Sequence, residues 1–68
     1  MTLKQSYLTG CEDGRQYYDP ESSPTFADLV AHRIDALRQD GMPEADCLTH
    51  AQAWACGWQD ATSDEADA

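Results

Sequence analysis

Apolar residues recur every three or four positions between residues 25 and 40, which predicts an amphipathic helix. Its apolar face consists of Phe26, Leu29, Val30, Ile34 and Leu37. Two N-terminal signals overlap: Ser23 before a proline offers one N-cap, and Thr25 with Asp28 offers a capping box. Gly41 stands where the helix must end in a left-handed residue.

A second and longer helix is predicted from 43 to 62, beginning with Pro43 and acidic residues in its first turn. Its apolar arc consists of Cys47, Leu48, Ala51, Trp54, Ala55, Trp58 and Ala61. Trp58 lies nearer the centre of this arc, so we expect it in the core, whereas Trp54 is either a core residue or an interface residue. The short connection through Gly41 and Met42 predicts an antiparallel helical hairpin.

Residues 3 to 18 allow two interpretations. A helical stripe is formed by Leu3, Tyr7, Cys11, Gly14 and Tyr18. Against a helix, two internal glycines cost about 1 kcal/mol each relative to alanine. The segment from Cys11 to Gly14 could instead be the turn of a β-hairpin between strands near 3 to 9 and 15 to 18. We expect the helix and keep the hairpin as the alternative.

The helical interpretation gains support from an internal echo. The run Tyr7-x-x-Gly10-x-x-Asp13 has the same spacing of aromatic, glycine and acid as Trp54-x-x-Gly57-x-x-Asp60. A glycine in the middle of a helix lets a second helix approach closely, because it has no Cβ atom. We therefore expect both glycines to serve packing.

The whole chain, 1 to 68, is expected to be one all-α domain of three helices built on the helical hairpin. Residues 19 to 24 are rich in proline, serine and acidic residues, and this composition predicts a linker between the first element and the helical hairpin. Residues 63 to 68 have no large side chain and are expected to form a disordered acidic tail. A domain of this size reaches only about 3 to 5 kcal/mol of net stability from one core.

The net charge of the chain limits the classes of macromolecule that it can bind. The chain has 13 acidic and 4 basic residues, a net charge of -9, and no basic residue after Arg38. Nucleic acid and anionic membranes repel such a surface, because binding to them depends on Lys and Arg. A basic protein surface attracts it, although surplus acid can also serve only solubility. The candidate partner-binding residues are Glu12, Asp13, Asp28, Asp35, Glu44, Asp46, Asp60, Asp64 and Glu65, with Asp19 and Glu21 as further acids.

The cysteines do not indicate a metal site or a catalytic site. The thiols and imidazoles available are Cys11, Cys47, Cys56, His32 and His50, and no Cys-x-x-Cys pair occurs among them. We expect neither zinc nor another cofactor, and no Cys-His catalysis, because a small helical domain leaves little room for a water-excluded pocket. The odd cysteine count and the lack of a signal-like N-terminus lead us to expect a cytoplasmic protein with free thiols.

The motif Trp54-x-x-Gly57-Trp58-x-Asp60-Ala61, preceded by Cys47 and by Tyr7-x-x-Gly10, resembles the ribosome modulation factor family and small phage proteins with the same helices. The resemblance implies a compact helical fold and a ribosome-associated regulatory module. In size and acidity the chain also looks like phage inhibitors of host defence, anti-CRISPR proteins among them.

These observations favour one function and leave two others open. The expected function is inhibition: a small acidic protein, monomer or weak homodimer, occupies the basic nucleic-acid-binding surface of a larger complex and blocks access of nucleic acid. The first alternative is the ribosome-associated module that the resemblance implies. The second is a small assembly or interaction protein whose acidic residues serve only solubility.

Overall fold

The structure is a computed structural model that describes residues 2–19, 21 and 24–66, with side chains described up to Ser63. The described residues form three helices and no strand: α1 spans Leu3–Tyr17, α2 spans Phe26–Gln39 and α3 spans Glu44–Ala66. The all-α prediction is confirmed. The β-hairpin alternative is wrong, because the helix continues without interruption through the segment from Cys11 to Gly14.

Capping residues set both ends of α2. Of the two overlapping N-terminal signals, the one at Thr25 forms: its hydroxyl accepts from the Asp28 backbone, and the Asp28 carboxylate accepts from Thr25. At the other end Gly41 has a φ of 90°. Its amide donates to the carbonyl of Arg38, and the Met42 amide donates to that of Leu37, both at 3.1 Å. This is a Schellman motif, and it turns the chain directly into α3.

The C-terminal helix is longer than predicted. It continues to Ala66 instead of ending at 62, so residues 63 to 66 of the expected disordered tail are helical, while 67 and 68 lie outside the described residues. No glycine or proline follows Gly57, and each residue added to an existing helix gains one more backbone hydrogen bond. The absence of large side chains therefore did not end the helix.

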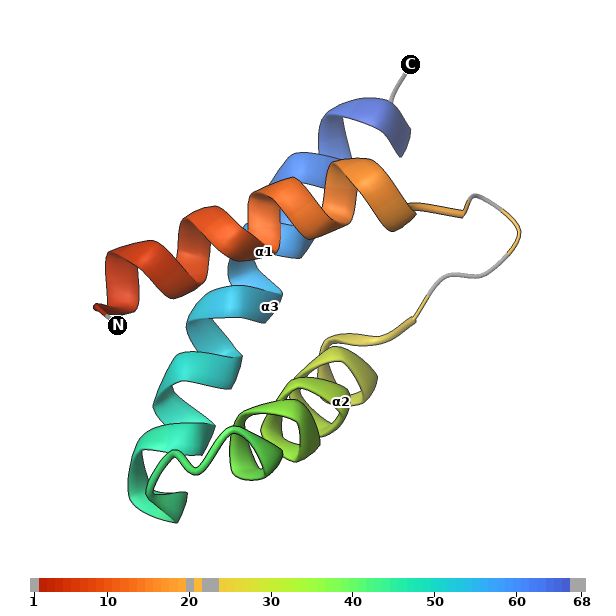
Figure 1. Cartoon of the computed structure of the whole chain (residues 1–68). Coiled ribbons are helices and arrows are strands. Elements are labelled where there is room, and N and C mark those ends of the chain that lie inside the picture. Colours follow the sequence, from red (N-terminus) through yellow and green to blue (C-terminus); the bar gives the residue numbers. More distant parts are fainter. Residues whose placement is uncertain (1, 20, 22–23, 67–68) are drawn as a thin grey trace.

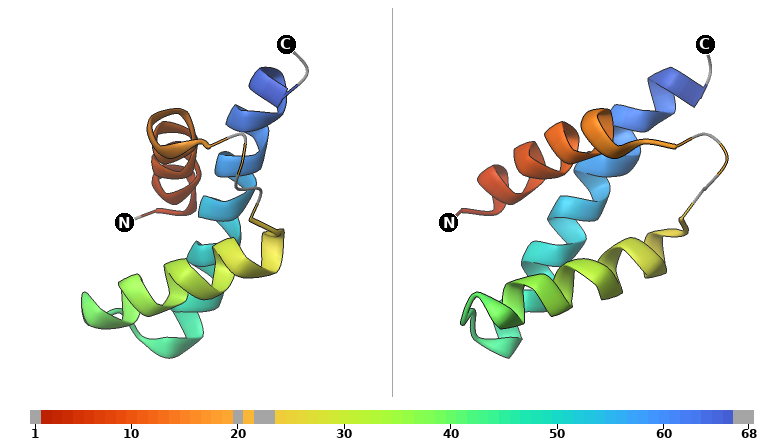
Figure 2. Two further views of the ribbon diagram at one scale, coloured as in Figure 1. Left: turned by 90° about the vertical axis from the view of Figure 1, so that its right-hand side faces the viewer. Right: turned by 45° about the vertical axis from the view of Figure 1, so that its right-hand side comes forward.

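Helix α3 is the central element, and both other helices pack against it (Figure 1). The described Cα atoms of α1 and α2 never come within 8 Å of each other. Two further views show α1 crossing one side of α3 (Figure 2). Helices α2 and α3 meet at the turn that connects them and diverge with distance from it. The predicted antiparallel hairpin of α2 and α3 is present, but α1 makes the more extensive packing with α3.

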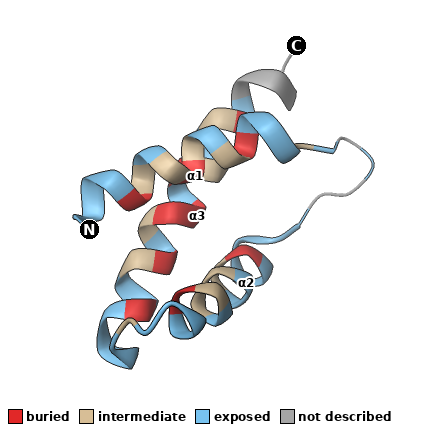
Figure 3. Ribbon diagram, viewed as in Figure 1, coloured by how far each residue is buried: buried red, intermediate tan, exposed pale blue. Residues whose placement is uncertain are grey.

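Between α2 and α3 the core is apolar. One cluster joins Leu29 to Trp54 and Ala55, and a second joins Leu37 to Cys47 and Ala51. Val30 contacts both clusters. Buried positions accordingly follow the inner faces of the two helices in Figure 3. The predicted apolar face of α2 is confirmed except at Phe26, which is 37% exposed in the first turn.

Between α1 and α3 the contact is made by small residues instead. The buried residues of α1 are Ser6, Gly10 and Gly14, each four positions from the next. The predicted stripe is thus confirmed at Gly14, whereas Leu3 is 49% exposed. The buried face is displaced from the stripe towards Ser6 and Gly10. A Cβ atom at Gly10 would overlap the carbonyl oxygen of Trp54, and one at Gly57 would overlap that of Tyr7. The prediction that these glycines allow close helix approach is confirmed.

Candidate functional site

The two echoing motifs bind each other. The Tyr7 hydroxyl donates a hydrogen bond of 2.5 Å to the Asp60 carboxylate, and the Trp54 indole N–H donates one of 2.9 Å to the Asp13 carboxylate. The aromatic residue of each motif thus pairs with the acid of the other, while the glycines allow the backbones to touch. Asp13 and Asp60, both expected to bind a partner, therefore also hold α1 against α3.

Proximity to Asp60 changes the acidity of Tyr7. The hydrogen bond to Asp60, with a contribution from desolvation and from the carboxylate charge, raises the pKa of Tyr7 to about 12 from its ordinary 10.0. The phenol accordingly stays neutral and remains a donor throughout the physiological range. It therefore acts as a stable link between the helices.

A third polar link between the same helices joins Ser6 to His50. The Ser6 hydroxyl lies 2.7 Å from Nδ1 of His50, and Ser6 is only 1% exposed. A serine beside a histidine has the composition of a nucleophile and its base, but no substrate can reach a hydroxyl this deeply buried. His50, which the sequence left as core edge or partner contact, is thus a residue of the helix interface.

Both tryptophans contact the core, but Trp54 is the more buried. Trp54, which the sequence left as core or interface, is 4% exposed and belongs to the core, whereas Trp58, expected in the core, packs against the same cluster and is only partly buried. Trp54 lies against Gly10 of α1 as well, and Asp13 satisfies its indole N–H, so both flanking helices cover it.

A cleft of about 500 Å³ lies between α1 and α2, with α3 at its base. Its walls combine aromatic rings with carboxylates. The residues that define the cleft are Asp13, Tyr17, Asp19, Asp28, Trp54 and Trp58, together with His32 and Arg33 of α2.

Within the cleft, one positive group is already stacked on an indole. The Arg33 guanidinium carbon lies 5.4 Å from the centre of the Trp54 ring, a cation–π distance. The Nε atom of Arg33 is buried and has no hydrogen-bond acceptor among the described residues. Asp13, Asp19 and Asp28 lie around the same cleft, so its formal charge is negative overall.

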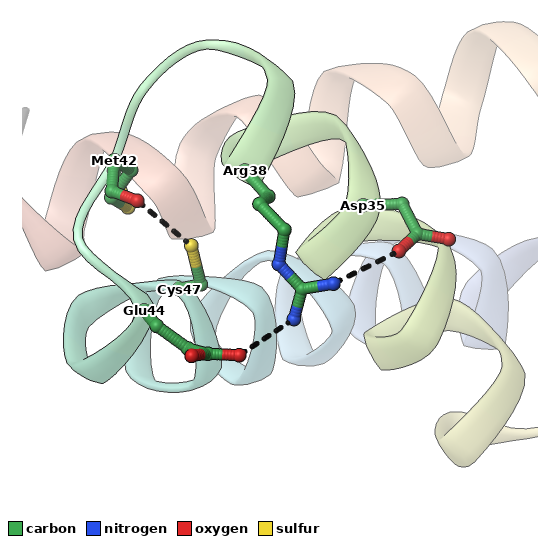
Figure 4. Close-up of polar contacts among 5 residues, drawn as sticks. All are labelled: Asp35, Arg38, Met42, Glu44 and Cys47. Carbon is green, nitrogen blue, oxygen red and sulfur yellow. Dashed lines mark hydrogen bonds and ion pairs between the residues drawn. The ribbon is translucent and has the colours of Figure 1, made fainter.

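The hairpin end carries a second group of predicted residues. Arg38 donates to Glu44 at 2.9 Å and lies 3.9 Å from Asp35 (Figure 4). All three side chains are more than half exposed, and exposed pairs of this kind contribute only about 0 to 1 kcal/mol. Asp35 and Glu44 are therefore partly neutralised by a cation of this chain.

The remaining predicted residues are dispersed. Glu12 is exposed on α1, and Asp46 is exposed in the first turn of α3. The side chains of Asp64 and Glu65 lie outside the described residues. Of the nine predicted residues, the structure thus brings Asp13 and Asp28 together at the cleft.

Sequence reasoning did not place Trp58 and Arg33 at this site. A signal for the cleft was available, because Asp28 and His32 are four residues apart and share one face of α2. The distance between α1 and α2 is set by α3, however, and no spacing within α2 encodes it.

The thiols lie in three different environments. Cys47 is fully buried and donates to the Met42 carbonyl at 3.5 Å, Cys11 is partly buried and Cys56 is exposed. The burial of Cys47 agrees with its place in the predicted apolar arc. No group of three or more His, Cys, Asp or Glu side chains is placed to hold a metal ion within the part of the chain that the structure describes.

Comparison of the chain with known protein families, characterised proteins and solved structures finds no match. Among the described residues, none of the helices combines the length and the apolar character that crossing a membrane requires.

Proposed function

We propose that this protein is a small acidic inhibitor that occupies the basic nucleic-acid-binding surface of a larger protein or complex and blocks the access of nucleic acid. The observation that carries the proposal is a surplus of carboxylates on the outside of a packed helical scaffold. Among the described residues, both ion pairs involve the single cation Arg38. Most of the net charge of -9 is therefore available to a partner.

The charge density of the protein supports binding to a site for single-stranded nucleic acid. A net charge of -9 along the longest dimension of 38 Å is about one charge per 4 Å. A single nucleic-acid strand carries one charge per about 3.4 Å, and a duplex carries one per about 1.7 Å. The protein is thus closer to a single strand, and we propose that it competes with single-stranded nucleic acid or with one strand of a duplex.

Most of the tryptophan motif serves the packing of the helices. Gly10, Trp54, Gly57 and Asp60 are all used in the packing of α1 on α3. The resemblance to ribosome modulation factor therefore concerns residues that build the helix pair. The accessible residues of the motif include Trp58 and Asp60, and no residue of the motif is basic, so it offers no cation for ribosomal RNA.

The proposal is tested by competition. The immobilised protein is exposed to a lysate of its source cells, and each retained protein is purified and assayed for nucleic-acid binding with and without the inhibitor. We expect stoichiometric inhibitor to displace single-stranded nucleic acid, and we expect the complex to weaken at least about tenfold between low and high salt. The proposal is wrong if no retained protein loses nucleic-acid binding, or if the chain itself binds nucleic acid.

A charge variant supplies the control. Replacing Glu12, Asp35, Asp40 and Asp46 by their amides removes four negative charges from exposed positions, of which only Asp35 approaches another side chain in an ion pair. If inhibition depends on charge, this variant must keep its helical content and lose inhibitory potency. Unchanged potency would contradict inhibition through charge, and self-association that tolerates these substitutions would favour the assembly alternative, in which the acidic residues serve only solubility.

A further inference from the structure

The cleft between α1 and α2 has the size of a ligand site. Its volume is about 500 Å³, within the range of about 300 to 1,000 Å³ typical of sites for small ligands or anchoring side chains. Leu29 and the indoles of Trp54 and Trp58 form the apolar part of its wall. Trp58 is only partly buried, so an aromatic surface remains accessible inside the cleft.

Aromatic faces in this position favour a cation. The Trp54 and Trp58 rings are tilted by 41° with centroids 5.4 Å apart, and Tyr17 of α1, which is 64% exposed, also lines the cleft. Such rings attract cationic groups through the negative potential of their faces. Arg33 already uses the Trp54 ring in this way, which shows that the geometry suits a guanidinium.

The carboxylates that line the cleft also favour a positively charged ligand. Asp13 lies on α1, Asp19 just after it and Asp28 on α2, and all three line the cleft. Arg33 is the positive side chain that lines the cleft beside these three carboxylates. The net charge of the cleft therefore attracts a second cation and repels an anion. A phosphate or a carboxylate ligand is disfavoured on this ground.

We propose that the cleft receives an arginine side chain of the basic protein partner and is the anchor of the interface. The inference rests on the proposed function and names the residues that carry it. Arginine fits better than lysine, because a planar guanidinium stacks on indole and donates to several carboxylates at once. The peptide carbonyl beside that arginine also offers an acceptor to the buried Nε of Arg33, which lacks one among the described residues.

The decisive variant neutralises the cleft without changing its shape. Asp13→Asn keeps an oxygen that accepts from the Trp54 indole, and Asp28→Asn keeps one that accepts from the Thr25 backbone. The double variant therefore loses two charges from the cleft and retains the hydrogen bonds of the fold.

A matched control exists on the same two helices. The double variant Glu12→Gln with Asp35→Asn also loses two charges from α1 and α2, but neither residue lines the cleft. Circular dichroism and thermal melting of both variants establish that each is folded to the same extent. Any difference in binding then reports the position of the charges and not their number.

The probe is a short arginine-rich peptide, with a citrulline peptide and a lysine peptide of the same length for comparison. Binding is followed through the indole N–H resonances of the two tryptophans, which both line the cleft. We expect the arginine peptide to shift both resonances and to bind about tenfold more weakly to the cleft variant. The control variant should stay within about twofold of the original protein, and citrulline should abolish the resonance shifts.

Three outcomes would overturn the proposal: equal loss of affinity in both variants, unchanged shifts with citrulline, or preferential binding of the lysine peptide. Failure of the proposed function is distinguishable from these. A protein that binds the arginine peptide in the cleft but displaces no nucleic acid from any partner keeps the cleft assignment and loses the inhibitory function. A protein whose cleft variant still inhibits fully keeps the inhibitory function and loses the cleft as the anchor of the interface.

Discussion

Gly10 and Trp54 are in backbone contact, and the carbonyl oxygen of Trp54 occupies the space that a Cβ atom at position 10 would need. The same tryptophan is covered by Leu29 on the side of α2. One residue of α3 therefore links both flanking helices. Because the walls of the cleft are carried by these two helices, the width of the cleft depends on this contact.

Gly10→Ala should destabilise the fold. The new methyl group meets backbone and cannot be accommodated by a side-chain rotation, so overpacking of about 1 to 3 kcal/mol is expected, offset by about 1 kcal/mol of helix propensity. Gly14→Ala is the graded control, because its nearest backbone atom is 3.0 Å away. Chemical denaturation should show a clearly larger loss for Gly10→Ala. Equal stability of the two variants would contradict the close packing.

Asp13→Ala should destabilise the protein by about 1 to 3 kcal/mol, because it leaves the buried Trp54 indole N–H without its acceptor. Asp13→Asn should cost much less, since an amide oxygen still accepts. Glu12→Ala, at the neighbouring exposed position, is the control. Thermal melting checks the order, since about 1 kcal/mol moves the midpoint by about 4 to 8 °C in a domain of this size. An Asp13→Ala midpoint equal to that of Glu12→Ala would argue against the hydrogen bond.

The sequence predicted the helices well because their signals are local. The apolar period of α2, the Thr25 capping box and the left-handed Gly41 each act within a few residues. The face that α1 buries was predicted only in part. Gly14 belonged to the helical stripe and Gly10 to the echoed spacing, but Ser6 carries no apolar signal. Its burial follows from contact with His50 of α3.

The candidate site was predictable only in part. Charge and composition identified Asp13 and Asp28 among nine acidic candidates, but not their position on opposite sides of one cleft. That position depends on how α1 and α2 are placed on α3, which involves contacts between residues more than forty positions apart, such as Asp13 with Trp54. The deeper burial of Trp54 relative to Trp58 depends on the same placement of the helices.

The three thiols should react in the order of their exposure. Cys56 is exposed and should react with an aromatic disulfide reagent in a fast phase, while Cys47 is fully buried and should react only when the helices open. Cys56→Ser should remove the fast phase and leave the protein folded. Denaturant should bring Cys47 into the fast phase. Rapid reaction of Cys47 in the native protein would contradict the packing of the Leu37 cluster.

Tyr7 should make stability depend on pH only at high pH. Its pKa is raised to about 12 in the folded protein from the ordinary 10.0, so the folded state favours the neutral phenol. The contribution of its hydrogen bond to Asp60 is thus fully present below pH 10 and is lost as the pH rises towards 12. The difference in stability between the original protein and Tyr7→Phe should shrink across this window.

Tyrosinate absorbance gives an independent measure of the same shift. The chain has three tyrosines, and one late ionisation step should disappear in Tyr7→Phe and persist in Tyr17→Phe. Asp60→Asn should move the late step to lower pH, because it removes the carboxylate that opposes ionisation while keeping an acceptor for the hydroxyl. A late step that survives in Tyr7→Phe would place the raised pKa on another residue and would contradict the pairing of the two motifs.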